Sequence, residues 1–201
     1  MSQELLADKI KSYIPEDAVA TIVHWIIEFK IDLTITPERK SVFGDYHWPQ
    51  KGKGHRISVN GDLNPYAFLI TLVHEVAHLT TWNKFRNKVS SHGNEWKSEY
   101  KILMEAFSGK RIFPLEVRNA FLQHLIAPSH THCNDPHLMM TLNKYNAKPG
   151  IYLGDLAEGT LFRFRNHIYK KGEKLRKRYQ CEQLKTNRHF LFNPTVEIIL
   201  V

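Results

Sequence analysis

The chain has 201 residues, of which 42% are hydrophobic and 24% are charged. This composition is typical of a globular protein with a buried core, and it excludes a disordered chain and a coiled-coil rod. The formal net charge of +8 is unevenly placed, because ten of the 28 basic residues but only three of the 20 acidic residues lie within residues 161–201. We therefore expect any affinity for an anionic partner to reside in this C-terminal segment.

The cysteine content and the apolar stretches indicate where the protein works. Two cysteines, Cys133 and Cys181, are too few for a disulfide framework, and a reducing compartment is the default for such a chain. The first residues show no charged-then-apolar signal pattern, and no apolar stretch reaches the roughly 20 residues that a spanning helix needs. The sequence thus predicts a cytoplasmic protein with no membrane partner, and it leaves the oligomeric state open.

The first part of the chain predicts helices followed by a small sheet. Apolar residues recur at helical spacing in two early segments and then alternate with polar residues. We expect helices over residues 3–14 and 16–30, and strands over 31–36, 42–48 and 55–59. Asn64 and Pro65 then provide an N-cap and a first-turn proline for a long helix that reaches Lys84.

The remainder changes from helices to strands. We expect helices over residues 94–107, 115–126 and 137–145, and strands over 160–168, 178–183, 188–192 and 196–201. This order predicts an α+β protein with two parts. A helix-rich body with a small sheet would occupy residues 1–150, and a small basic β-rich appendage would occupy residues 151–201.

The motif that most strongly indicates a catalytic metal site is His74-Glu75-Val76-Ala77-His78. Residues four apart share one face of a helix, so His74 and His78 can reach the same metal ion. Glu75 is turned by about 100° from His74, which lets its carboxylate take a proton from water beside the ion without binding the ion. With 12 histidines in the chain, this pentapeptide can also arise by chance. It lies, however, in a segment, 66–84, that contains no proline or glycine and is expected to form a helix, as the shared face of His74 and His78 requires.

A catalytic zinc site needs a third protein ligand, and His92 is the best candidate. It follows a loop after the motif helix and precedes the next helix, so a chain reversal can bring it back toward His74 and His78. Gly93 beside it permits a close approach of the backbone. The sequence therefore predicts one Zn²⁺ held by three histidines, with a fourth position open for chemistry.

These two motifs, His74-Glu75-x-x-His78 and His92-Gly93-x-Glu95-Trp96, resemble the SprT-like metalloprotease family in order and spacing. The resemblance covers roughly residues 15–110. It implies a zincin-like helical body with a small antiparallel sheet, zinc ligation by His74, His78 and His92, and Glu75 as the general base. Members are zinc-dependent proteases, and the eukaryotic relative Spartan degrades proteins crosslinked to DNA. The function implied is that of a zinc metalloendopeptidase.

The C-terminal appendage departs from many relatives, which end in a zinc ribbon with paired cysteines. Cys181 has no such partner, so a structural zinc there is doubtful. Apolar residues must hold the β-fold instead, and the candidates are Phe162, Phe164, Phe190 and Phe192. A second group of potential metal ligands has a spacing that matches no known zinc-binding pattern, so a surface loop is the better interpretation. Its members are His130, His132, Cys133 and His137.

Basic residues interleaved with aromatic residues in the appendage favour a nucleic-acid partner, single-stranded or distorted DNA. The candidate binding residues are Arg163, Arg165, Lys170, Lys171, Lys174, Arg176, Lys177 and Arg178. A merely solvated basic face is the competing interpretation.

Several points about the reaction stay open in the sequence. An extended protein substrate is expected along a strand edge, with 55–60 as the candidate strand. His47, Tyr100 and Tyr145 are candidates for stabilising the oxyanion, and the sequence does not choose among them. Two alternatives to a DNA-guided peptidase remain: a zinc-containing nucleic-acid-binding module with little proteolytic activity, and a zinc hydrolase acting on a non-protein amide.

Overall fold

A computed structural model of the protein describes residues 3–39, 42–107, 112–126 and 135–201. The helices are α1 (Gln3–Ile10), α2 (Glu16–Glu28), α3 (Pro65–Phe85), α4 (Asn94–Glu105), α5 (Leu115–Ile126) and α6 (Pro136–Asn143), with short 3₁₀ turns η1 (Arg86–Lys88) and η3 (Leu153–Asp155). The strands are β1 (Asp32–Thr36), β2 (Gly44–His47), β3 (Arg56–Asn60), β4 (Ile151–Tyr152), β5 (Leu161–Phe164), β6 (His167–Lys174), β7 (Tyr179–Gln183), β8 (Arg188–Phe192) and β9 (Glu197–Leu200). Helices together with two sheets confirm the predicted α+β class.

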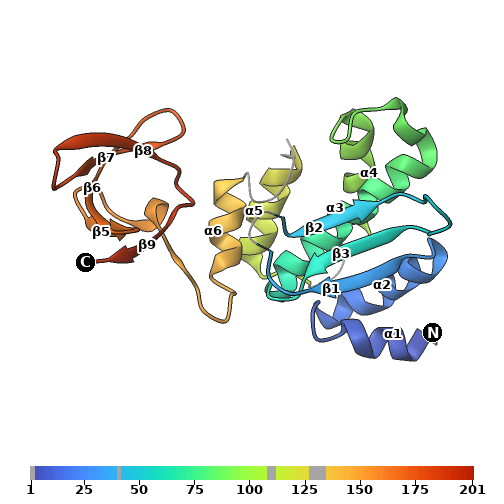
Figure 1. The fold of residues 1–201 in the computed structure, drawn as a ribbon. Coiled ribbons are helices and arrows are strands. Elements are labelled where there is room, and N and C mark those ends of the chain that lie inside the picture. Colours follow the sequence, from blue (N-terminus) through green and yellow to red (C-terminus); the bar gives the residue numbers. More distant parts are fainter. Residues whose placement is uncertain (1–2, 40–41, 108–111, 127–134) are drawn as a thin grey trace. The chain divides into compact units, whose positions relative to one another are not determined.

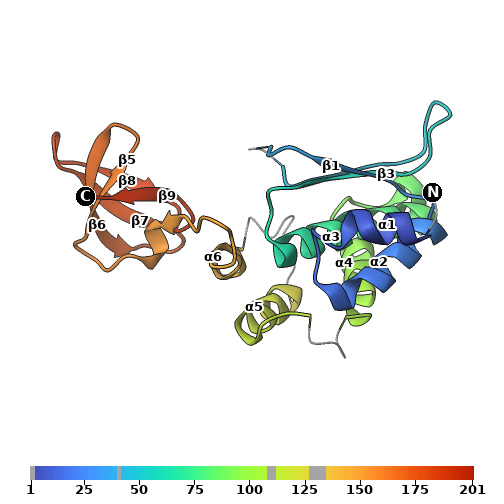
Figure 2. The same cartoon turned by 90° about the horizontal axis from the view of Figure 1, so that it is seen from below.

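The first compact unit, residues 1–138, is a layer of helices on a small sheet. Its strands lie in the order β1-β3-β2, with β3 antiparallel to β2 and parallel to β1. The sheet is therefore mixed, whereas a wholly antiparallel one was expected. Helices α1 to α4 lie on the same side of the sheet, as Figure 2 shows. Leu33, Ile57 and Val59 point into the layer between sheet and helices and are buried.

Helix α3 is the centre of this unit. Asn64 caps it as predicted, because its side-chain oxygen accepts hydrogen bonds from the backbone N–H groups of Tyr66 (3.2 Å) and Ala67 (3.0 Å). Every residue from Ala67 to Ala77 is buried, so the middle of the helix has no exposed side. A polar side chain placed there is held by its neighbours on every side.

The second compact unit, residues 139–201, is a curled sheet (Figure 1). In the part of the chain that the structure describes, its strands lie in the order β4-β9-β5-β6-β7-β8. Its core contains Phe162, Tyr169 and Phe192. Phe164 packs against this core, whereas Phe190, which was expected to help hold the fold, is 39% exposed.

The strand expected over residues 160–168 is wrong. Arg165 and Asn166 form a two-residue turn between β5 and β6, and Phe164 pairs with His167 across the hairpin. Asn166 is the one turn-favouring residue at this position, and a single asparagine was too weak a signal to divide the strand. Arg165 adopts a positive φ of 53°, a conformation that glycine, asparagine and aspartate favour and that arginine does not announce in the sequence.

The two units divide at residue 138, whereas the sequence placed the division after residue 150. The C-terminal part of α6 and the segment after it belong to the second unit. Asn143 exchanges two hydrogen bonds with the backbone of Gly150, at 2.6 and 3.0 Å. Met140 packs against Gly154, where an added Cβ would lie 2.8 Å from its terminal carbon. These contacts tie the helix end to the sheet that follows.

Other boundaries differ by a few residues. Helix α1 ends at Ile10 instead of residue 14, and α4 ends at Glu105 instead of residue 107. None of the helices in the described ranges is long and apolar enough to cross a bilayer.

Candidate metal centre

Two segments of the first unit, α3 and the turn before α4, bring the three predicted histidines together. His74 and His78 lie one turn apart on this helix, and the chain then turns back through η1. A tight turn, in which the N–H of Gly93 donates to the carbonyl of Ser90 at 3.0 Å, places His92 immediately before α4. The loop residue and the two helix residues are thereby brought together, as the sequence predicted.

The three imidazoles converge on one point. The Nε2 atoms of His78 and His92 each lie 3.2 Å from Nε2 of His74, and one ligand atom from each residue lies within 4.8 Å of the others. Two nitrogens bound to a tetrahedral zinc at about 2.0–2.1 Å would lie about 3.3 Å apart. The donor set and its spacing therefore fit a zinc ion.

Trp96 on α4 forms the floor beneath the histidines. Its ring centroid lies 4.6 Å from that of His74, 5.4 Å from His78 and 4.8 Å from His92. The indole is completely buried and stacks in turn on Tyr100, at 5.1 Å. Packing on a rigid aromatic pair fixes the rings of the three histidines, which lowers the entropy that an ion would have to remove on binding.

Burial tunes the protonation of the site. It lowers the pKa of His78 from 6.5 to about 3, with a further contribution from nearby His92. The neutral imidazole, which is the form that binds a metal, is thus retained well below neutral pH. Burial also raises the pKa of Glu75 to about 8, and the nearby Asp45 carboxylate adds to this effect while Arg39 opposes it.

Strand β2 holds the Glu75 carboxyl in place. A Cβ built on Gly44 would lie 2.8 Å from Oε1 and 2.9 Å from Cγ of Glu75, and 2.7 Å from Cγ2 of Thr71. Only glycine leaves room for the carboxyl at this position. Sequence reasoning missed Gly44, because nothing local shows which strand residue will lie against the motif helix.

A buried asparagine supports the segment that precedes β2. Asn60 donates from Nδ2 to the carbonyls of Arg39 and Val42, both at 3.1 Å. Its Oδ1 accepts from Nε of Arg39 at 2.7 Å. This network fixes the guanidinium whose charge acts on Glu75.

A cavity of about 400 Å³ opens beside the histidines and Glu75. Tyr46 lies in its wall, with its ring parallel to that of His78 at 6.5 Å and its hydroxyl 2.9 Å from Nδ1 of His55. The oxyanion candidates are placed differently. His47 pairs with Asp45 at 2.7 Å, Tyr100 is buried beneath Trp96, and Tyr145 belongs to the second unit. None of the three is among the described residues that line the cavity.

The expectation that 55–60 forms the substrate edge is wrong. Strand β3 is paired on both sides, with β1 and with β2. The edge of the sheet next to the histidines is β2, whose residues Gly44, Asp45 and Tyr46 line the cavity. Strand β3 lies in the middle of the sheet because it pairs in parallel with β1 as well as antiparallel with β2. The order of the strands along the chain does not reveal this arrangement.

The predicted nucleic-acid-binding residues of the second unit differ in their exposure and surroundings. Arg165 and Arg178 line one cavity, and Lys170 and Lys171 line another. Arg163, Lys174, Arg176 and Lys177 are exposed, whereas Lys171 is 3% exposed and donates to the carbonyl of Leu156. Lys171 therefore does not belong to an exposed binding surface. Of the second histidine cluster, His130, His132 and Cys133 lie outside the described residues.

Comparison with known proteins places this site in a family. Residues 18–119 match the model of the SprT-like family, and this range includes the sheet, α3, the turn that carries His92, and α4. No curated protein and no solved structure matches the chain. The match covers about half of the chain and contains every residue of the three-histidine cluster and Glu75, so the chain belongs to the SprT-like family.

Proposed function

We propose that this protein is a zinc-dependent endopeptidase that acts on DNA-associated proteins. The observation that carries the peptidase proposal is the convergence of three histidine nitrogens beside a buried carboxyl group in an open cavity. A site with a purely structural metal gains nothing from Glu75 at this position. The family is metalloprotease-related, which supports the same conclusion.

His74, His78 and His92 would hold the ion, which supplies Lewis acidity toward the substrate carbonyl and toward water. Glu75 accepts the proton of the attacking water on its carboxylate and then donates that proton to the leaving amine. One carboxyl group serves both steps, since it takes up a proton in the first and releases it in the second. Gly44 keeps the carboxyl at the position from which it can do so.

Strand β2 is the proposed binding edge for the substrate. Its outer side has no partner strand among the described elements, and three of its residues line the cavity. An extended peptide that pairs with this edge would lie across the site with its backbone held by ladder hydrogen bonds. The wall formed by Tyr46 and Trp82 would then contact the substrate side chains.

The proposal that the substrates are bound to DNA rests on the second unit. Its exposed basic residues give residues 161–201 a strong excess of positive charge. Such a surface attracts phosphates and concentrates DNA-bound proteins near the site.

The test compares the zinc-loaded protein with the variant Glu75→Gln. Both should contain one zinc ion per chain, and only the parent should cleave a DNA-binding protein, faster with single-stranded DNA than without. Glu28→Gln serves as the control, since this exposed carboxylate on α2 pairs with His24, does not line the cavity and should leave cleavage unchanged. Equal cleavage by Glu75→Gln, or a parent protein that binds no zinc, would refute the peptidase proposal.

The same experiment addresses the two alternatives. A nucleic-acid-binding module with a zinc site would bind zinc and DNA but would cleave no protein in any of the conditions. A hydrolase for non-protein amides would cleave small amides in a Glu75-dependent way and leave proteins intact.

A further inference from the structure

We propose that the aromatic pocket of the second unit binds an unpaired base of single-stranded DNA, with Arg165 and Arg178 contacting the neighbouring phosphates. This proposal rests on the DNA-directed part of the proposed function and is independent of the peptidase chemistry. The aromatic pocket is a cavity of about 670 Å³ between β5, β6 and β8. Such a volume is in the range of small-molecule and base-sized ligand sites.

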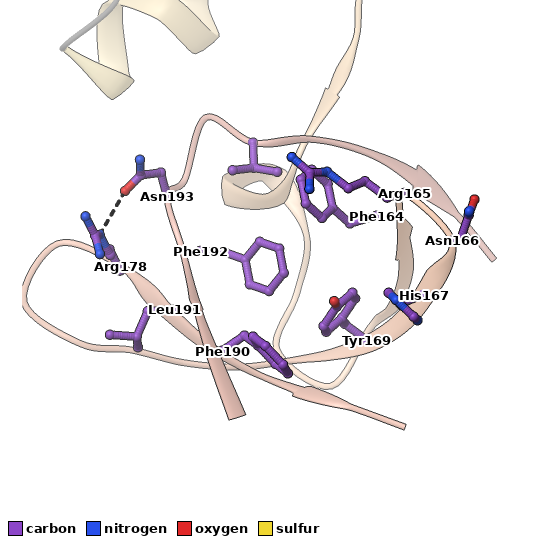
Figure 3. Close-up of a pocket in the computed structure, with 11 residues that line it drawn as sticks. Phe164, Arg165, Asn166, His167, Tyr169, Arg178, Phe190, Leu191, Phe192 and Asn193 are labelled. Carbon is purple, nitrogen blue, oxygen red and sulfur yellow. Dashed lines mark hydrogen bonds between the residues drawn. The ribbon is translucent and has the colours of Figure 1, made fainter. Parts of the chain in front are cut away.

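The pocket is built from aromatic rings in contact with one another. Phe192 lies 5.0 Å from Tyr169 and 5.4 Å from Phe164, measured between ring centroids, and Tyr169 lies 5.7 Å from Phe190. Tyr169 and Phe192 are buried and form the base, whereas Phe190 is 39% exposed. Figure 3 shows the rings of Phe190, Phe192 and Tyr169 in the middle of the pocket.

Cationic and amide groups flank the rings on two sides. Arg178 donates from Nε to Oδ1 of Asn193 at 3.2 Å, and these two residues lie at one side of the pocket (Figure 3). Arg165, Asn166 and His167 lie at the other side, with the guanidinium of Arg165 5.3 Å from the ring of Phe164. A strand that passes over the rings would meet an arginine on either side of the stacked base.

The charge of the lining selects the class of ligand. No aspartate or glutamate is among the described residues that line the aromatic pocket. An aromatic cage for a methylated lysine would be opposed by two arginines with no carboxylate to offset them. The neighbouring cavity of about 610 Å³ is lined by Glu158, Glu173 and Glu182 as well as Lys170 and Lys171, so it does not share this preference.

The exposure of Phe190 distinguishes the pocket from a simple core. Phe190 and Phe192 are two apart on the edge strand β8, and only Phe192 is withdrawn from solvent. Bases stack on aromatic side chains with a free energy of about 1–3 kcal/mol per base. Phe190 is therefore the residue whose loss should weaken base binding without changing the charge.

The experiment measures fluorescence anisotropy of labelled (dT)15 with the full chain over a range of salt concentrations. Phe190→Ala should raise the dissociation constant about five-fold or more at every salt concentration, with an unchanged slope of log K against log salt. Arg165→Gln should instead reduce that slope by about 0.7, the value for one lost contact to a single strand. Leu200→Ala is the control, since this side chain is 51% exposed on β9 and does not line the pocket.

A second variant guards against unfolding. Phe190→Trp keeps a stacking ring and should retain the affinity, and the added tryptophan fluorescence should be quenched by unlabelled (dT)15. Unchanged binding by Phe190→Ala, or duplex DNA binding as tightly as (dT)15, would overturn the pocket proposal.

The outcomes separate the two proposals. If (dT)15 binding responds to Arg165→Gln but not to Phe190→Ala, DNA attraction stands and the pocket fails. If the parent does not bind (dT)15, both the pocket and the DNA-directed part of the proposed function fail, while Glu75-dependent cleavage remains to be judged separately.

Discussion

Replacing Gly44 by alanine should disable the site without removing its metal. The new Cβ would lie 2.7 to 2.9 Å from Thr71 Cγ2 and from Oε1 and Cγ of Glu75. Ordinary carbon contacts are about 3.5–4.0 Å, so these groups must retreat by roughly 0.6–1.3 Å. Glu75 is only 7% exposed and lines the cavity beside the histidines, so the carboxyl can give way only by shifting within the site, away from its present position.

The size of the effect follows from this displacement. A catalytic group misplaced by about 1 Å loses about 100-fold in rate, and the added methyl should destabilise the fold by about 1–3 kcal/mol. We therefore expect kcat to fall about 100-fold in Gly44→Ala, with one zinc still bound by the three histidines. Steady-state peptide cleavage and metal analysis of the same preparation measure the two quantities.

Gly54→Ala is the matched control for this experiment. Gly54 lies in the loop before β3, and the nearest atom to its added Cβ would be the carbonyl oxygen of Lys30 at 3.9 Å. It should keep full activity. If Gly44→Ala remains within about two-fold of the parent, the position of Glu75 against β2 does not limit the reaction and our reasoning is wrong.

Three other predictions concern stability. Zinc at 100 times its dissociation constant should stabilise the chain by about 2.7 kcal/mol, so a chelator should lower the melting temperature, and no shift would contradict the three-histidine site. Asn60→Ala, which removes the hydrogen bonds to the carbonyls of Arg39 and Val42 and to Nε of Arg39, should lower the free energy of unfolding by about 2–4 kcal/mol in urea titrations. Burial lowers the pKa of His124 below 6.5 despite its bond to Asp135, so the folded state binds fewer protons and stability should fall as pH drops below 6.5. In His124→Gln this fall should be shallower, and an unchanged pH profile would contradict it.

The sequence predicted most about α3 and least about what packs against it. Asn64, Pro65 and a segment without proline or glycine predict the motif helix because capping and helix breaking are local effects. The position of His92 beside this helix depends on the packing of Trp96 beneath the three histidines. The spacing of residues in the sequence could therefore name His92 only as a candidate ligand in a loop. Gly44 and Tyr46 were missed because the facing of a strand against a helix is set by tertiary packing.

The second unit shows the same limit. The β-rich character of residues 151–201 was visible, but the turn at Arg165 was not, since arginine at positive φ is no turn signal. Basic composition pointed to DNA without separating exposed cations from Lys171. Only the fold shows that Lys171 is buried and that Phe190 is exposed.

The complete burial of the middle of α3 has a consequence for mutational scanning of this protein. Positions such as Phe68, Leu72 and Val76 serve only the core, so variants there should disappear equally from a selection for abundance and from a selection for cleavage. His74 and Glu75, each 7% exposed, are buried as well, yet neutral or apolar replacements would relieve the desolvation of polar groups. Such variants should survive the first selection and fail the second, so comparing the two would distinguish the reacting residues from the scaffold within one helix.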